Sequence, residues 1–191
     1  MFKLFGNAKN SVKSPKILIC FVGDAMENAN FQQEKSIYQM YQDVTEYRAA
    51  AGADLLAFVD GKTYDIVHLL ASVADDGTVG GSFGIQVLEG LSKAGAKLVV
   101  FASENPVENY VAAFPPKQRI GFVEPNLVLT LERKGENFVK FFGSLFGLMA
   151  KGRTMPMAWV KMAPQGGDSR RMQELPETIF EANLGQIKFV P

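Results

Sequence analysis

The stretch Lys16-Ile-Leu-Ile-Cys-Phe-Val22 is apolar at every position after its lysine, and it ends at Gly23-Asp24. An apolar run without polar alternation indicates a strand that is buried on both faces of a sheet. Three later runs have the same character, at residues 64–73, 97–102 and 126–131. Together they predict an α/β fold, a three-layer sandwich with a mostly parallel central sheet.

The remaining elements follow from helical spacing and from turn residues. Apolar side chains recur every three or four positions between residues 30 and 51, which predicts a helix that ends at Gly52. A short strand is predicted for 54–59, because the turn pair Asp60-Gly61 follows it. Helices are also predicted for 85–95, 107–114, 135–151 and 154–162, a loop for 164–178 and a last strand for 186–190.

Composition bounds the function. The chain has 191 residues with 20 basic and 20 acidic side chains, so we expect neither nucleic acid nor a membrane as partner. One cysteine and one histidine cannot build a zinc site, and we expect no cofactor. No apolar run reaches the ~20 residues that cross a bilayer, which favours a soluble cytoplasmic protein. Residues 16–191 are expected to form a single domain after a flexible polar leader over 1–15.

Four stretches share a pattern with a known family. Tyr64-Asp-Ile-Val-His-Leu-Leu-Ala-Ser-Val73 precedes the turn Asp75-Asp-Gly77, and Leu98-Val-Val-Phe-Ala-Ser-Glu-Asn105 forms the next apolar run. A phenylalanine-rich helix, Gly152 and Ala158-Trp159 follow within residues 138–163. In this order they resemble the caspase-like peptidase fold, in particular its bacterial CHAT branch. The resemblance implies a histidine base at the end of the third strand and a cysteine nucleophile at the end of the fourth.

The positions that would carry this chemistry are substituted. Ser72 stands at the histidine position, and the cysteine position falls on Glu104, or on Ser103 if the register shifts by one. The resemblance therefore implies a pseudo-peptidase, a catalytically inactive domain that acts as a protein-interaction or regulatory module. The predicted vestigial cleft lies at the carboxyl edge of the sheet and comprises Asp24, Ser72, Asp75, Asp76, Ser103 and Glu104.

Three alternatives to an inactive cleft remain open from the sequence. Cys20 and His68 could be close in space if their strands are neighbours, although both are typical core residues of apolar strands. The carboxylates of the carboxyl edge could support a hydrolase with an atypical residue set or a metal-assisted activity, because hard cations prefer oxygen ligands. The glycine-rich stretch 77–84 could hold a phosphate on its backbone N–H groups or simply be a flexible loop.

The helix predicted for 135–151 is apolar on more than one face. One set of side chains, at positions 138, 142, 145 and 149, is expected to pack on the sheet. Val139, Phe141 and Phe146 then need cover from the following helix around Trp159, from the C-terminal segment or from another chain, and the Trp159 helix alone is thin cover because it is short. We therefore predict self-association or a protein partner at this surface.

Overall fold

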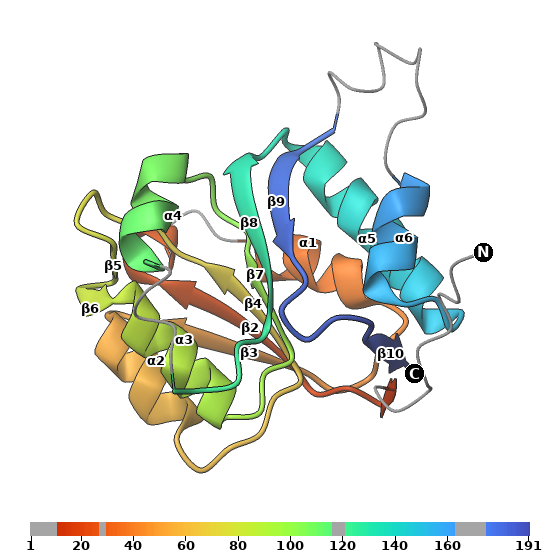
Figure 1. The fold of residues 1–191 in the computed structure, drawn as a ribbon, viewed down its shortest axis with the longest axis horizontal. Coiled ribbons are helices and arrows are strands. Elements are labelled where there is room, and N and C mark those ends of the chain that lie inside the picture. The colour runs from red at the N-terminus through yellow and green to blue at the C-terminus, as the bar shows by residue number, and fades with distance from the viewer. Residues whose placement is uncertain (1–10, 27–29, 116–120, 163–174) are drawn as a thin grey trace.

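The computed structural model describes residues 11–26, 30–115, 121–162 and 175–191, and a six-stranded sheet forms its centre (Figure 1). The strand order is β3-β2-β4-β7-β8-β9, and all neighbouring pairs are parallel except β8 and β9. The strands are β2 (Ile17–Val22), β3 (Val44–Ala49), β4 (Ile66–Leu70), β7 (Leu98–Phe101), β8 (Asn126–Glu132) and β9 (Glu177–Glu181). The predicted α/β class with a mostly parallel sheet is confirmed.

Helices cover both faces of the sheet. Leu18, Cys20 and Val22 of β2 face the core shared with α2 (Gly52–Val59), α3 (Gly84–Lys93) and α4 (Val107–Ala113). Their neighbours along the strand point the other way, because successive side chains of a strand alternate between faces. That second core is shared with α1 (Phe31–Lys35), the 3₁₀ turn η3 (Ser36–Tyr38), α5 (Glu136–Ala150) and α6 (Met155–Met162). No helix among the described residues is long and apolar enough to cross a membrane.

Five short elements complete the fold over the described residues. The 3₁₀ turn η2 (Gly23–Met26) follows β2, and β5 (Thr78–Val79) and β6 (Ser82–Phe83) form an antiparallel hairpin before α3. Strand β1 (Ser11–Lys13) pairs in parallel with β10 (Lys188–Val190). The last predicted strand therefore exists, but it pairs outside the central sheet. Within the leader expected over 1–15, Ser11–Lys13 form β1, and residues 1–10 lie outside the described residues.

The segment 30–59 differs from the prediction. The helix ends after one short stretch, and residues 44–49 form β3 at the edge of the sheet. Their valine, threonine and tyrosine side chains suit a half-exposed strand, although they also fall at helical spacing. Residues 52–59 are helix α2 and not a strand. Asp54 Oδ2 accepts a hydrogen bond from the Ala51 N–H at 2.9 Å, which stabilises the first turn of this helix.

The loop predicted for 164–178 overlaps a strand. Residues 163–174 lie outside the described residues, and Glu177 is the first residue of β9. Antiparallel pairing with β8 brings this segment into the central sheet.

Helix α5 is covered by its own chain. Phe138, Phe142, Leu145 and Met149 are buried as predicted. Phe146 is also fully buried, with its ring centroid 4.7 Å from that of Tyr38.

The side chains of α5 that were expected to need a further cover are covered within the chain. The Phe141 ring lies edge-on to Trp159 at 5.7 Å, and Val139 is half-buried against the same core. In the folded chain Phe141 and Phe146 are therefore buried and cannot contact a partner protein directly. Much of the cover comes from the segment around Tyr38, which the sequence had placed on a longer helix.

Candidate functional site

The ends of β4 and β7 place the predicted cleft residues at one edge of the sheet. Leu69 and Phe101 are register partners on these neighbouring strands, and the Ala102 N–H donates to the Leu69 oxygen at 2.8 Å. Ser72 follows β4 and is exposed. Ser103 and Glu104 follow β7, and Ser103 is half-buried whereas Glu104 is exposed. The arrow of β2 in Figure 1 points toward this edge, where α4 and the β5–β6 hairpin lie.

Asn105 connects the two strand ends. Its Oδ1 accepts from the Val73 N–H at 2.7 Å, and its Nδ2 donates to the oxygens of Ala71 at 3.3 Å and Ser103 at 3.1 Å. The same Nδ2 donates to the Tyr110 hydroxyl at 3.0 Å, and burial raises the pKa of that hydroxyl. A neutral amide thus satisfies backbone groups between the two strand ends that would carry the catalytic pair in the family that the sequence resembles. The sequence placed Asn105 at this edge without assigning it a role.

The acidic residues of the edge have separate partners. Asp75 accepts from Asn109 Nδ2 at 3.2 Å, and Glu104 Oε1 accepts from the Arg133 N–H at 2.6 Å. Asp76 accepts from the Thr78 hydroxyl and N–H at 2.8 and 3.0 Å, and these bonds lower its pKa. Asp24 lies in η2 and is exposed.

No metal-binding group emerges from these acids. Among residues 11–26, 30–115, 121–162 and 175–191, no three His, Cys, Asp or Glu side chains gather closely enough to hold a metal ion. The described carboxylates of the acidic edge therefore do not form the metal-binding group that the metal-assisted alternative requires.

Cys20 and His68 lie on neighbouring strands but on opposite faces of the sheet. The parallel register pairs His68 with Ile19, and Cys20 with Leu69. Cys20 belongs to the core beneath α2 and α3, whereas Ile19 belongs to the core beneath α5. Burial raises the pKa of the Cys20 thiol to about 12. The sheet itself separates the thiol from the imidazole, so the two cannot form a dyad.

His68 is part of a buried polar cluster, which we define as Glu34, Tyr38, His68 and Arg133. His68 Nε2 lies 2.9 Å from Glu34 Oε2, and His68 Nδ1 lies 2.9 Å from the Tyr38 hydroxyl. The Arg133 guanidinium pairs with the other oxygen of Glu34 and donates to the Ala102 oxygen at 3.0 Å. Burial opposes ionisation of Glu34, but the hydrogen bonds and charges of His68 and Arg133 outweigh it and lower the pKa of this carboxyl.

This buried polar cluster is structural in character. Glu34, Tyr38 and His68 are each at most 2% exposed, and both ring nitrogens of His68 have partners inside the chain. A substrate would have no direct access to the imidazole. Sequence reasoning missed the cluster, because Glu34 and Arg133 are 99 positions apart and no local pattern connects them.

The glycine-rich stretch 77–84 is a packed hairpin. A Cβ atom added to Gly77 would lie 2.4 Å from the backbone of Ala112, and one added to Gly84 would lie 2.6 Å from the Cβ of Ala113. The Gly84 N–H donates to the Gly77 oxygen at 3.0 Å. The glycines therefore permit close approach to α4. At Gly77 and Gly84 the chain itself fills the space that a phosphate cradle would need.

Three of the cavities that described residues line lie away from the predicted cleft. One of about 450 Å³ lies near Lys97 and Val123, and one of about 390 Å³ lies near Lys16. Both are at the amino-terminal ends of strands, and a third of about 550 Å³ lies between the carboxyl ends of α2 and α3. Comparison of the chain with protein-family models and with curated proteins finds no match.

Proposed function

We propose that this chain is a catalytically inactive caspase-like domain that acts by binding another protein. The order of the motifs supports the family assignment, and a mostly parallel sheet flanked by helices is the architecture that the resemblance implies. Many unrelated functions share such sheets, so the proposal depends on the residues at the carboxyl edge.

The observation that carries the proposal is the position of the only thiol and the only imidazole. Cys20 and His68 are buried on opposite faces of the sheet, and His68 is engaged with Glu34 and Tyr38. A general base must come within about 3 Å of the proton that it removes, directly or through one water. At the two strand ends the chain instead carries Ser72 and Ser103-Glu104, bridged by Asn105.

The binding role is supported by exposed apolar side chains near the same edge. Phe83 in the hairpin is 60% exposed and Val111 on α4 is 62% exposed. Exposed apolar groups that gather on one surface are typical of interaction sites, and loops at the end of a rigid sheet are common places for them.

The experiment is a peptidase assay on the purified full chain with fluorogenic peptide libraries. We expect no turnover above that of a heat-denatured sample. Turnover that is lost in Cys20→Ala or in His68→Ala, while the variant keeps its folded circular dichroism spectrum, would overturn the proposal. A serine-directed fluorophosphonate probe provides the second arm, and labelling of Ser72 or Ser103 would favour the hydrolase alternative.

A further inference from the structure

The β5–β6 hairpin and α4 pack closely against each other. Gly77 and Gly84 approach the backbone and the side chain of α4 so closely that no Cβ atom would fit at either position. Asn109 Nδ2 adds hydrogen bonds to the Val73 oxygen at 2.7 Å and to Asp75. We call this surface the acidic ridge and define it by residues 72–86 and 103–115. Because the ridge is preorganised, little conformational entropy is lost when a partner binds to it.

The acidic ridge exposes apolar side chains on its outer side. Tyr110 and Ala113 attach α4 to the core, whereas Val107 and Val111, one helical turn apart, are 41% and 62% exposed. Among the large apolar side chains that are exposed in the described residues, Phe83 is the aromatic one. It directly precedes Gly84, which contacts α4. These side chains can anchor a partner by burial of apolar area.

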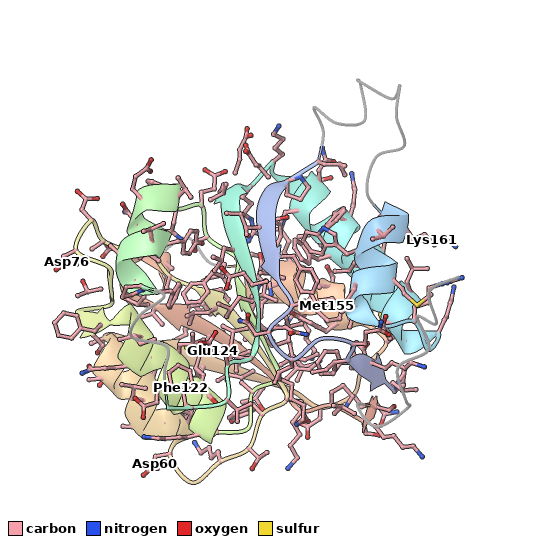
Figure 2. The ribbon with its side chains drawn as sticks, viewed as in Figure 1. Asp60, Asp76, Phe122, Glu124, Met155 and Lys161 are labelled. Atoms are coloured by element: carbon pink, nitrogen blue, oxygen red, sulfur yellow. The ribbon has the colours of Figure 1, made fainter. Side chains whose placement is uncertain are left out.

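The charged side chains among the residues that define the acidic ridge are all acidic, and Arg133 beside Glu104 is paired with Glu34. Residues 72–86 and 103–115 contain Asp75, Asp76, Glu104 and Glu108 and no lysine or arginine. The first three carboxylates accept hydrogen bonds from neutral groups, which leave their negative charge in place. Within the described part of the chain, none of the four pairs with a lysine or arginine side chain. Figure 2 shows Asp76 on the outer side of the molecule, next to the hairpin.

We propose that the acidic ridge binds a cationic peptide segment with apolar anchor residues, presented by a partner protein. This inference rests on the proposed function and names the partner of that domain. Lysine or arginine side chains would pair with the four carboxylates, and one or two leucine or phenylalanine side chains would pack on Phe83 and Val111. Nucleic acid and anionic lipid carry the same charge sign as the ridge and are repelled by it.

The test measures fluorescence anisotropy of labelled 15-residue synthetic peptides with the purified full chain. One pool combines lysine and arginine with leucine and phenylalanine, a second replaces the basic residues by glutamate, and a third replaces the apolar residues by serine. We expect only the first pool to bind, with an affinity that falls about tenfold when salt is raised, because exposed charge pairs are screened. Equal or tighter binding of the glutamate pool, or no binding of any pool, would overturn the inference.

Matched variants locate the binding site. Asp76→Asn combined with Glu108→Gln removes two charges and keeps the acceptor for Thr78, and Phe83→Ser removes the aromatic anchor. Asp60→Asn, at the carboxyl end of α2, and Met157→Ser, on α6, are the controls. Both side chains are exposed, Figure 2 shows Asp60 well away from Asp76, and α6 lies on the other face of the sheet. We expect each ridge variant to weaken binding about tenfold and the controls to leave it unchanged.

Different results would overturn the acidic ridge as the binding site and the proposed function of the chain. Peptide binding that is lost in Met157→Ser but kept in the ridge variants would overturn the acidic ridge while leaving a binding domain. Cleavage of the peptides would overturn the proposed function itself. Circular dichroism of every variant shows whether a loss of binding reflects a loss of fold.

Discussion

His68 Nε2 lies 2.9 Å from Glu34 Oε2 in the core between the sheet and α5, and the histidine is 1% exposed. Both ring nitrogens of His68 have a partner inside the chain, because Nε2 faces Glu34 and Nδ1 lies 2.9 Å from the Tyr38 hydroxyl. Arg133 balances the charge of Glu34. The histidine therefore holds α1 and η3 against β4 through polar contacts as well as through packing.

His68→Leu should lower the free energy of unfolding by about 3 kcal/mol, because it leaves the buried Tyr38 hydroxyl without a partner and Glu34 with one partner fewer. Burial alone would make leucine a tolerable replacement. Urea denaturation measures the change, and the double variant with Tyr38→Phe serves as the control. If the two residues act together, the two losses will not add. A cost below about 0.5 kcal/mol would contradict a role for the network.

Acid should remove the stability that Glu34 contributes. Its pKa is lowered in the folded chain, so the contribution is fully present above its unfolded pKa of about 4.3 and is lost as pH falls through the folded value. We expect Glu34→Gln to be less stable than the wild type at pH 7, with a difference that shrinks progressively below about pH 4. Urea midpoints of both proteins from pH 7 to pH 2.5 provide the measurement. A difference that stays constant with pH would show that Glu34 does not ionise differently on folding.

Cys20 should react with iodoacetamide only when the chain unfolds. The side chain is fully buried and its pKa is raised to about 12, so the thiolate is scarce and inaccessible at pH 8. Mass spectrometry with increasing urea should show alkylation following the unfolding transition seen by circular dichroism. Rapid stoichiometric labelling of the native protein would place the thiol at the surface and reopen the question of catalysis.

Asn105→Ala should destabilise the carboxyl edge by about 2 kcal/mol, because the Val73 N–H and the Ala71 oxygen lose their side-chain partner in a buried position. Asn137→Ala on α5, which is half-buried, is the matched control and should cost less than 1 kcal/mol. Thermal unfolding compares the two variants. Equal costs would mean that Asn105 does not brace the strand ends.

Phe146→Glu should unfold the chain and not dissociate an assembly. The side chain has no exposed area and packs against Tyr38 and Tyr41, so a carboxylate there would be buried without a partner. Val160→Glu on α6, where the wild-type side chain is 69% exposed, should keep the fold. Sedimentation and circular dichroism distinguish the outcomes. A folded Phe146→Glu variant of smaller mass than the wild type would restore the predicted interface on α5.

The apolar runs determined the central strands from the sequence alone. β2, β4, β7 and β8 lie where continuous apolar segments predict them, because strands buried on both faces cannot carry alternating polar residues. The sequence also placed Ser72 and Ser103 at strand ends. It failed over residues 44–59, where an edge strand and a short helix carry patterns that fit either structure.

The tertiary structure alone decided which residues meet. A strand alternates its side chains every residue, so the register between β2 and β4 determines that Cys20 and His68 point to opposite faces, and no local pattern contains that register. Glu34 meets His68 and Arg133 only because α1 and the residue after β8 come to one end of the sheet. Local sequence periodicity can indicate that a residue is buried, but partners far apart in the chain come together only through the packing of complete elements.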